Sequence, residues 1–452
     1  MRQRKAILLA AGEGSRMKSK KAKVLHEVMG KSMVQRVVDV AKSAGLEEIA
    51  VIVGHQAEQV QEALKDSGVT FFLQQEQKGT GHAVMQAESF LEEGKDVVIL
   101  YGDTPLLQKE TLLSLMDFHE QAQNAVTIIS SLVDQPDGYG RIVRDEAGQF
   151  VKNVEHKDAS EAQRQIKEIN SGIYCFDGGC LKEALKKINN QNAQGEYYLP
   201  DTLSVLKAEG KKVDAMVVSD SRQFLGVNTR AQLAQVQKVL QERVNAYWMN
   251  EGVTILDPAT TYIADTVTIG MDTVIYPQTL LEGHTVIGEN CQIGPCTRLT
   301  DMTVGDETTM QFTTAMESTV GSFTKVGPYA YIRPNCHIGN HIKVGDFVEV
   351  KNSVIGDGTK ISHLTYVGDN DVGQNINFGC GTVTVNYDGK KKYRTVIEDN
   401  VFIGCNANLV APVTLKEGSY VAAGSTITKD VPPKALAVAR NRQTNLEGWS
   451  KK

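Results

Sequence analysis

The sequence predicts two folded domains of different classes, a Rossmann-like α/β domain followed by a parallel β-helix of hexapeptide repeats. Up to about Thr229, short apolar runs alternate with helical patterns, and after Gly252 an aliphatic residue recurs at every sixth position. One helical pattern lies between these two parts. A chain of 452 residues is also too long for one ordinary core. We therefore place a first domain at 1–229, a helical linker at 230–251 and a second domain at 252–452.

The first part alternates strand-length and helix-length patterns. Bounded apolar runs lie at Ala6–Ala10, Ile49–Val53, Val97–Leu100 and Ala125–Ser130. Helical segments lie between them at Met33–Ala44, Ala57–Leu64 and Ala83–Phe90. Strands that alternate with helices imply crossover units, so we expect a mostly parallel sheet with helices on both faces.

The segment from Arg230 to Asn250 has the pattern of a single helix. Its apolar residues fall on one stripe at helical spacing. They are Leu233, Val236, Leu240, Val244 and Tyr247. Because neither Gly nor Pro interrupts the segment, we expect a stiff connector.

Hexads dominate the remainder of the chain. The aliphatic residue recurs from Ile263 to Leu299, from Val304 to Met316, from Val320 to Val350 and from Ile397 to Ile427, with shorter runs between. Hexads sustained over about 160 residues indicate a parallel β-helix, in which three hexads make one triangular coil. A stack of antiparallel hairpins would instead show turn signals every 8–12 residues or so. The period breaks most at 384–394, where we expect a loop that leaves the coil.

Composition excludes several classes of protein. The formal net charge of -6 and the pI near 5.9 argue against nucleic-acid binding. No apolar run reaches the roughly 18 residues of a membrane helix, and the run at Ala6–Ala11 is too short for a secretory signal. The seven cysteines contain no C-x-x-C pair, which favours reduced thiols over disulfides or a zinc site. We expect a cytoplasmic protein with neither membrane nor nucleic-acid partners.

The glycine-rich segment Leu8–Met17 ends the first predicted strand, where backbone N–H groups can approach phosphate oxygens. Three familiar motifs do not fit nearby. A dinucleotide fingerprint requires Gly at Met17, a P-loop requires Gly at Leu25, and a zinc-protease helix requires His at Gly30.

The same segment, with a Lys soon after it, resembles the opening of the sugar-1-phosphate nucleotidyltransferases. Further matching segments are Leu73–Ala83, Tyr101–Asp103, Gly138–Arg141, Val154–Ala159, Glu168–Gly172 and Gly226–Asn228. In this order, and followed by hexads, the chain from Lys5 to Trp449 resembles the bacterial bifunctional N-acetylglucosamine-1-phosphate uridyltransferases/glucosamine-1-phosphate acetyltransferases. The resemblance implies synthesis of UDP-N-acetylglucosamine, a cell-wall precursor, from UTP, acetyl-CoA and amino-sugar phosphate.

Uridylyl transfer accumulates negative charge around the α-phosphorus of UTP, so it requires cations and a hard metal. Asp103 follows a predicted strand and suits Mg²⁺, and the resemblance makes Asn228 its partner ligand. Arg16 and Lys23 are the expected catalytic cations. Taken alone, Asp103 could equally be a turn or cap residue, and Glu155 a solvated carboxylate. The resemblance assigns nucleotide contacts to Leu9, Ala10, Ala11, Gly12, Gln74, Gly79, Thr80, Tyr101 and Gly102, and sugar contacts to Gly140, Glu155 and Asn170.

For the hexad domain, the resemblance implies a left-handed coil, a homotrimer, and acetyl-CoA bound between subunits. His363 is the candidate base that takes a proton from the glucosamine amine, since an imidazole suits this task near neutral pH. The alternative is a His363 that merely faces outward. By the resemblance, Arg333, Lys351, Tyr366 and Asn377 bind glucosamine-1-phosphate, and Cys380, Asn386, Tyr387, Cys405, Ala423 and Arg440 contact acetyl-CoA.

Two of these positions depart from the family pattern, because Cys380 stands where Ala is common and Cys405 where Ser is common. A thiol is a poorer hydrogen-bond donor than a hydroxyl, so the affinity for acetyl-CoA could be lower if the Ser side chain matters.

Two other functions are compatible with the domain order. The hexad half could serve assembly alone, without catalysis, and the set around His363 argues against this. A ligand-binding sensor without catalysis is disfavoured by the Asp103–Asn228 pair.

Overall fold

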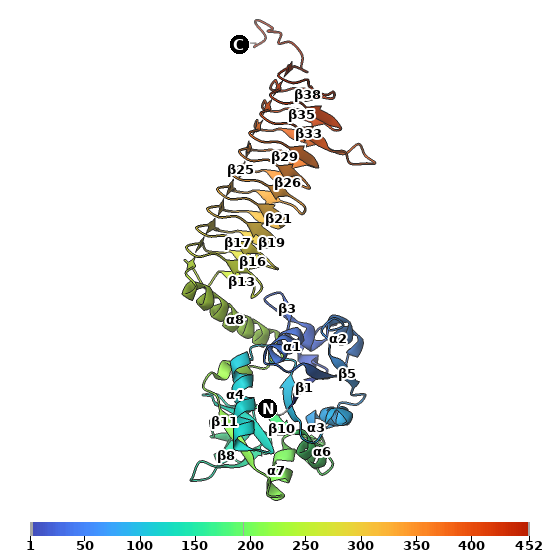
Figure 1. Ribbon diagram of the computed structural model, residues 1–452, viewed down its shortest axis with the longest axis vertical. Helices are drawn as coiled ribbons and strands as arrows, with labels where there is room; N and C mark the ends of the chain where they lie inside the picture. The colour runs from blue at the N-terminus through green and yellow to red at the C-terminus, as the bar shows by residue number, and fades with distance from the viewer. Residues whose placement is uncertain (1–2, 193, 451–452) are drawn as a thin grey trace. The chain divides into compact units, whose positions relative to one another are not determined.

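The computed structural model describes residues 3–192 and 194–450. The chain divides into two compact units, Met1–Leu240 and Gln241–Lys452, and the division falls within helix α8 (Arg230–Asn250). Figure 1 shows the α/β unit in blue to green and the coils of the second unit in yellow to red. Among the described residues, no helix combines the length and apolarity that crossing a bilayer requires.

The first unit is built on a mixed sheet with the strand order β11-β7-β10-β6-β1-β4-β5. These strands are β1 (Arg4–Ala10), β4 (Glu48–Val53), β5 (Thr70–Leu73), β6 (Asp96–Tyr101), β7 (Val126–Leu132), β10 (Glu168–Asp177) and β11 (Val213–Val217). All neighbouring pairs in this order are parallel except those made by β10, which runs antiparallel to β6 and β7. The predicted α/β class with a mostly parallel sheet is confirmed.

Two separate cores explain why β1 reads as a continuous apolar run. Ala6 and Leu8 belong to one buried cluster, whereas Ile7 and Leu9 belong to another. Because side chains alternate across a strand, each face of the sheet packs against its own layer of helices. Helices α1 (Met33–Ser43) and α4 (Lys109–Ala122) contribute to the first cluster, and α3 (Thr80–Met85), α6 (Gly178–Leu185) and α7 (Asp201–Ala208) contribute to the second.

The order of the strands reverses at β1, which has a later strand on each side. β4 lies on one side of β1 and β6 on the other, and both are parallel to it. In open α/β sheets, a crevice opens at such a switch point, beside the carboxyl ends of the strands. The segments after Ala10 and after Tyr101 therefore meet at one edge of the sheet.

The predicted helix Ala83–Phe90 is wrong in its extent. Helix α3 begins at Thr80, directly after Gly79 with its φ of 100°, and ends at Met85. A short 3-10 helix, η3 (Glu88–Phe90), follows and brings the Phe90 ring edge-on to Phe72, with 6.2 Å between their centroids. A tertiary contact, which the local pattern does not encode, ends the α-helix early.

Helix α8 is continuous over the predicted range, and its two halves make different contacts. Val236 and Val239 are buried in a cluster of the first unit that also contains Met17. In the second unit, the side-chain amides of Gln241 and Asn245 donate to the carbonyl of Thr261 at 2.7 and 3.1 Å.

The predicted place of Tyr247 on the apolar stripe of α8 is wrong. Tyr247 is 55% exposed, whereas Trp248 is buried. The stripe continues at four-residue spacing from Leu240 through Val244 to Trp248, rather than stepping three residues to Tyr247.

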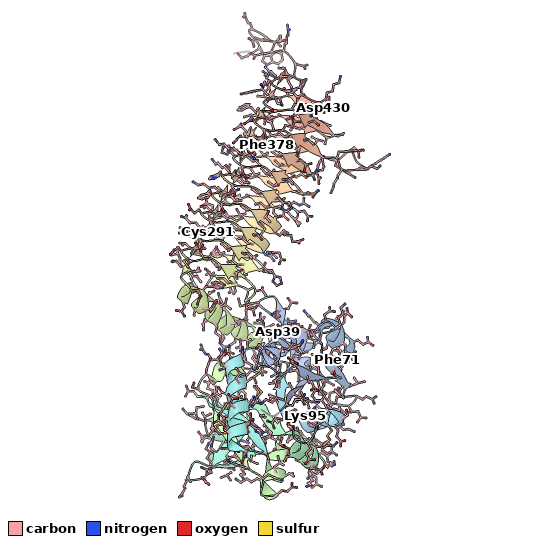
Figure 2. The ribbon with its side chains drawn as sticks, viewed as in Figure 1. Asp39, Phe71, Lys95, Cys291, Phe378 and Asp430 are labelled. Carbon is pink, nitrogen blue, oxygen red and sulfur yellow. The ribbon has the colours of Figure 1, made fainter. Side chains whose placement is uncertain are left out.

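The second unit is the predicted parallel β-helix. In its first coils, Ile263 pairs with Leu281, and Leu281 pairs with Leu299, so that each coil contains eighteen residues. All three side chains are fully buried. Phe378 and Cys291, labelled in Figure 2, are buried in the same way on other coils.

Met316 does not occupy the inward position that the hexads predict, and Ala315 faces the interior instead. Strand β19 (Arg298–Val304) pairs with β21 (Thr314–Val320) so that Leu299 lies beside Ala315, only sixteen residues on. The shorter coil shifts the inward position by one residue relative to the predicted register.

The predicted loop leaves the coil between β32 (Val383–Val385) and β33 (Thr395–Ile397), and it projects from the orange-red coils in Figure 1. The guanidinium of Arg394 donates to both carboxylate oxygens of Asp371, at 2.9 and 2.5 Å, and to the carbonyl of Asn370. One end of the loop is thereby held on the neighbouring coil.

Candidate active sites

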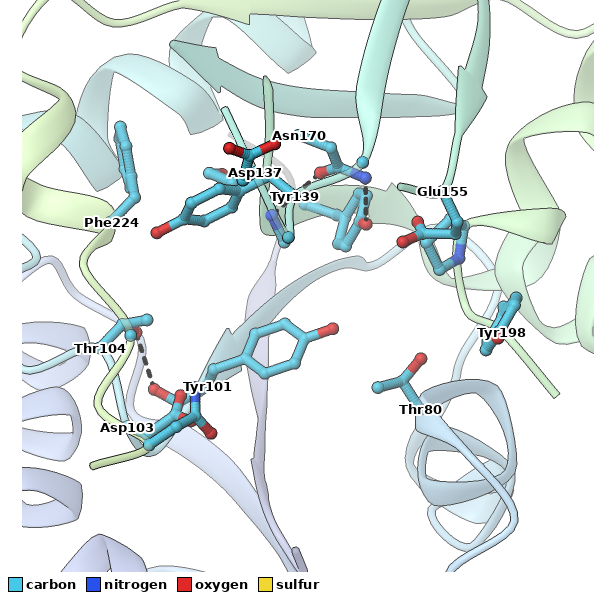
Figure 3. Close-up of a pocket in the computed structure, with 18 of the residues that line it drawn as sticks. Thr80, Tyr101, Asp103, Thr104, Asp137, Tyr139, Glu155, Asn170, Tyr198 and Phe224 are labelled. Carbon is cyan, nitrogen blue, oxygen red and sulfur yellow. Dashed lines mark hydrogen bonds between the residues drawn. The ribbon is translucent and has the colours of Figure 1, made fainter. Parts of the chain in front are cut away.

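Two adjoining cavities open at the carboxyl ends of β1 and β6 in the first unit. One has a volume of about 550 Å³ and the other of about 300 Å³. Thr80, Tyr101, Asp103 and Glu196 line both of them. Figure 3 shows the larger cavity, with the Tyr101 ring between Asp103 and Thr80.

The predicted nucleotide and sugar residues line these two cavities, with one exception. The smaller cavity is lined by Leu9, Ala10, Ala11, Gly12, Lys23, Gln74 and Gly79, and the larger by Arg16, Gly140, Glu155, Asn170 and Asn228. The exception, Gly102, lies beneath the lining, and its backbone N–H donates to the carbonyl of Leu9 at 2.9 Å. A Cβ atom on Gly102 would approach Val24 to 3.2 Å, so the close packing there favours glycine.

The glycine-rich segment positions Lys23. Gly14 has a φ of 64°, in the left-handed region, and a Cβ atom there would lie 2.5 Å from Cβ of Lys23. The absence of this atom lets the Lys23 side chain pass close to the backbone. Its ammonium reaches the carboxylate of Asp103 at 2.5 Å and the amide oxygen of Asn228 at 3.1 Å.

Asp103 and Asn228 meet the requirement of a Mg²⁺ site for hard oxygen donors. Asp103 follows β6, and Asn228 lies two residues before the start of α8, yet their oxygens converge on the same ammonium group. Both residues line the larger cavity. The ammonium of Lys23 shows that this position is suited to a cation.

A hairpin and β10 form the sugar side of the larger cavity. Strands β8 (Arg141–Arg144) and β9 (Phe150–Val154) pair antiparallel, which brings Gly140 and Glu155 together. A Cβ atom on Gly140 would approach Oε1 of Glu155 to 3.0 Å. Asn170 accepts from the backbone N–H of Gly172 at 2.9 Å and donates to the Tyr174 hydroxyl at 2.8 Å (Figure 3).

Burial raises the pKa values of two side chains that line the larger cavity. It raises the pKa of Glu155, although a hydrogen bond from Asn153 opposes the shift. Burial also raises the pKa of Tyr101, helped by the nearby Glu155 and Asp103 carboxylates. The Tyr101 hydroxyl therefore stays protonated and can donate to a ligand at neutral pH.

The sequence interpretation missed Glu196, which lines both cavities, and Tyr139 and Tyr198, which line the larger one. Glu196 lies on a segment held beside the start of α3, since the Tyr197 N–H donates to the carbonyl of Lys78 at 2.8 Å. This tertiary pairing brings Glu196 to the site, and no local pattern in the sequence marks it.

In the second unit, His363 makes a close pair with Asp346, which was not predicted. Strands β25 (Lys343–Asp346) and β28 (Lys360–His363) lie on neighbouring coils and pair Asp346 with His363. Nδ1 of His363 lies 2.6 Å from Oδ1 of Asp346. This hydrogen bond lowers the pKa of Asp346, so the ionised carboxylate can only accept. Nδ1 therefore carries the proton, and the lone pair of Nε2 is available as a base.

Three predicted phosphate-binding residues lie on successive coils. Arg333, Lys351 and Tyr366 lie on or directly after the paired strands β23 (Tyr331–Ile332), β26 (Glu349–Lys351) and β29 (Tyr366–Gly368). Arg333 pairs with Glu349 at 3.0 Å. Lys351 pairs at 3.3 Å with Asp369, whose side chain is nearly buried.

Asn386 and the unpredicted Lys392 bring the loop to this cluster. The Asn386 amide donates to the Asp369 carboxylate at 2.5 Å and to the Tyr366 hydroxyl at 3.3 Å. Lys392 lies beside Lys351, and the repulsion between the two ammonium groups lowers the pKa of Lys392. A phosphate dianion would relieve this repulsion. The basic run in which Lys392 lies was the available sequence signal.

The predicted acetyl-CoA residues Cys380, Cys405 and Ala423 form one column with His363 along the coil axis. The backbone N–H after each column position donates to the carbonyl one coil below. These bonds run from Gly381 to His363 (3.4 Å), from Asn406 to Cys380 (2.8 Å) and from Gly424 to Cys405 (2.8 Å). Arg440 extends the column, because a Cβ atom on Gly424 would lie 3.9 Å from its Cδ.

Two predicted residues lie apart from these groups. Asn377 is on β31 (Asn377–Phe378), between Lys360 and Phe402 on the neighbouring strands, and thus on a different sheet from Arg333 and Lys351. Tyr387 lies on the loop, 56% exposed, and its hydroxyl donates to the carbonyl of Gly389. The single chain does not bring either residue into the Arg333–Lys351 cluster.

Comparisons with known proteins cover both units. The model of the nucleotidyl transferase family matches residues 5–253, and the model of the bacterial transferase hexapeptide family (six repeats) matches 266–301, 317–352 and 394–429.

Relatives of nearly the same length share half of the sequence or more. Bifunctional protein GlmU of Caldanaerobacter subterraneus subsp. tengcongensis is 54% identical over 444 residues, which cover 98% of this chain and 97% of that protein. The protein of the same name from Acetivibrio thermocellus is 54% identical over 98% of this chain and 96% of its own length. That of Halalkalibacterium halodurans is 50% identical over 99% of both. The chain belongs to the GlmU family of bifunctional proteins.

Proposed function

We propose that this protein makes UDP-N-acetylglucosamine in two steps at two separate sites. The second unit transfers the acetyl group of acetyl-CoA to the amine of glucosamine-1-phosphate. The first unit transfers the uridylyl group of UTP to N-acetylglucosamine-1-phosphate and releases pyrophosphate. The observation that carries the proposal is that hydrogen bonds fix one catalytic side chain in each unit. Lys23 is held by Asp103 and Asn228 in the first unit, and His363 is held by Asp346 in the second.

Uridylyl transfer relies on position and charge. The smaller cavity, with Gln74 and Gly79 in its lining, takes the uracil and ribose, and the larger one takes the sugar. Lys23 and Arg16 stabilise the negative charge that grows as pyrophosphate leaves. Asp103 and Asn228 would hold Mg²⁺, which would further neutralise the charge of the triphosphate when bound.

The sugar side of the larger cavity orients the phosphate that attacks UTP. Glu155 and Asn170 offer acceptors and a donor for sugar hydroxyls and for the N-acetyl group, and Tyr101 presents a protonated hydroxyl. Holding both reactants in fixed positions removes the entropy cost of bringing them together.

Acetyl transfer relies on general base catalysis. Nε2 of His363 takes a proton as the glucosamine nitrogen attacks the thioester carbonyl, and the thiolate of CoA leaves with a proton returned by the imidazole. Asp346 orients the ring and stabilises the imidazolium that forms between these steps. Arg333, Lys351 and Lys392 bind the sugar phosphate.

The protein is proposed to act as a homotrimer in the cytoplasm, where UTP and acetyl-CoA are available. An exposed aromatic ladder on the β-helix supports assembly. Phe312, Tyr329 and Phe347 lie on successive coils with ring centroids 5.4 Å apart, and the exposed rings of Tyr329 and Phe347 are stacked. Leu364 continues the column beside His363. An apolar column of this kind is a suitable subunit interface. A neighbouring subunit could also complete the acetyl site that Asn377 and Tyr387 do not reach within one chain.

The separation of the two sites can be tested by His363→Ala. Acetyl transfer should fall by about 10²–10⁴-fold, the usual contribution of a general base, while uridylyl transfer is unchanged. His337→Ala is a matched control, because His337 is also an exposed histidine on a coil strand and its side chain hydrogen-bonds to the hydroxyl of Thr319 rather than to a carboxylate. Equal loss of both activities in His363→Ala, or loss in the control, would refute the separation.

A further inference from the structure

Two of the seven cysteines occupy the same position on neighbouring coils. Cys380 follows β31 (Asn377–Phe378) by two residues, and Cys405 follows β34 (Phe402–Ile403) by two residues. Those strands pair Phe378 with Ile403, both buried in the coil interior. The N–H after Cys405 donates to the carbonyl of Cys380 at 2.8 Å. The two cysteines are therefore vertical neighbours.

The turns that follow the two cysteines are also similar. The residue after each cysteine is in the left-handed region, with φ of 74° at Gly381 and 55° at Asn406. Similar turns on successive coils place the two cysteines at the same outward position of the coil, with Cys405 exposed and Cys380 partly exposed. Neighbouring parallel strands lie about 4.8 Å apart, within the Cα separation of about 4.4–6.8 Å at which disulfides form.

The other five cysteines lack this arrangement. Cys175, Cys291 and Cys336 are buried. The exposed Cys296 donates its thiol to the side chain of Gln278, one coil below. Cys180 lies on α6 in the first unit. The pair is thus distinct within the chain, and Cys296 is a natural control.

We propose that Cys380 and Cys405 form a reversible dithiol modification site that switches acetyl transfer off when oxidised. The oxidant is a low-molecular-weight disulfide. The thiolate of Cys405 attacks it and releases one thiol, and the thiolate of Cys380 then attacks the mixed disulfide and releases the second. Two protein thiols are oxidised, one small disulfide is reduced, and two protons pass to the departing thiolates.

The effect on acetyl transfer rests on the function proposed above. The two cysteines lie between His363 and Ala423 in the column that acetyl-CoA is proposed to follow. A bond between their sulfur atoms would draw the side chains together across this track and remove them as contacts for the cofactor. Acetyl-CoA bound along the column should in turn protect both thiols.

The test oxidises the full-length protein with glutathione disulfide and follows mass, thiol number and both activities. The wild type should lose two thiols and about 2 Da, without retained glutathione, as internal disulfide formation requires. Peptide mapping should join Cys380 to Cys405. Acetyl transfer should fall about tenfold or more while uridylyl transfer is kept, and dithiothreitol should restore it. Acetyl-CoA should slow the reaction.

Variants separate the pair from other thiols, each compared with its own reduced state. Cys405→Ser should not form the internal disulfide and should retain acetyl transfer under the same treatment. Cys380→Ala should not form it either, although Cys405 can take up glutathione as a mixed disulfide. Brief reduction should remove that glutathione, after which Cys380→Ala should retain its acetyl transfer. Cys296→Ser should behave as the wild type. Retained glutathione without a joined peptide, or inactivation of Cys405→Ser equal to that of the wild type, would overturn the proposal.

The outcomes also distinguish this proposal from the proposed function. If the reduced protein has no acetyl transfer activity, the proposed function of the second unit is refuted. A peptide that joins Cys380 to Cys405 would then show that the disulfide forms but does not regulate acetyl transfer. A protein active in acetyl transfer in which no joined peptide forms would refute the dithiol site alone.

Discussion

Replacing Asp346 with Ala tests whether this carboxylate positions His363. The variant keeps the imidazole but loses the acceptor that holds the proton on Nδ1, at 2.6 Å in the structure. A placed general base contributes about 10²–10⁴-fold, and Asp346 acts only through His363, by orienting the imidazole and stabilising its protonated form. Because the His363 side chain is 53% exposed and that of Asp346 37%, water can replace part of the lost interaction. We expect kcat of acetyl transfer to fall about five- to thirtyfold, well short of the loss in His363→Ala.

The assay follows release of the CoA thiol from acetyl-CoA with saturating glucosamine-1-phosphate, across pH. The hydrogen bond from His363 lowers the pKa of Asp346, so the carboxylate is ionised throughout the neutral range. The ratio of wild-type to variant kcat should therefore stay constant from about pH 8 to 9.

A matched control replaces another carboxylate at a coil corner. Asp357 accepts the backbone N–H of Asn340 at 2.7 Å and takes no part in the proposed chemistry. Asp357→Ala should leave kcat of acetyl transfer unchanged. An unchanged kcat in Asp346→Ala, or an equal loss of uridylyl transfer, would refute the positioning role.

Three further predictions concern the first unit. Gly14→Ala should lower uridylyl transfer about tenfold or more, because the new Cβ atom would displace Lys23, and acetyl transfer assayed in the same sample should not change. Burial raises the pKa of Asp201 to about 6, so its ionised form costs stability above that pH. Asp201→Asn should thus raise the Tm of the first unit near pH 8 but not near pH 4, and a gain in acid would contradict the assignment. A chain that ends after Leu240 should remain a folded uridylyltransferase. A chain that ends after Thr229 lacks two buried valines of α8, so its free energy of unfolding should be lower by roughly 3–6 kcal/mol. Equal denaturant midpoints for the two chains would contradict this prediction.

Periodicity predicted the fold well because burial alternates with a fixed period in both units. The alternation of Ile7 and Leu8 between two cores is a direct consequence of the strand period, and the hexads match the faces of the coil. Exceptions arise where a coil is shorter than eighteen residues, as at Ala315, or where a tertiary contact ends a helix, as at Phe90. The direction of β10 could not be predicted, since an apolar run carries no sign of parallel or antiparallel pairing.

The sites were predictable where a motif lies close in sequence and not where distant segments meet. Lys23 follows the glycine-rich segment, and that spacing made it recognisable. Asp346 lies seventeen residues before His363, one coil below, so counting back one coil from the proposed base could have found it. Glu196 reaches its cavity because its segment pairs with the start of α3, and no period in the sequence indicates this.

The central claim, that each unit catalyses one step, is tested most directly by incubating the purified protein with the proposed substrates. Glucosamine-1-phosphate, acetyl-CoA, UTP and Mg²⁺ are supplied together, and free CoA thiol and pyrophosphate are measured separately over time. We expect thiol to appear first and pyrophosphate after a lag, and pyrophosphate to appear without a lag when N-acetylglucosamine-1-phosphate replaces the first two reagents. Pyrophosphate without thiol would leave the β-helix without catalysis, and the absence of both products would contradict the claim entirely.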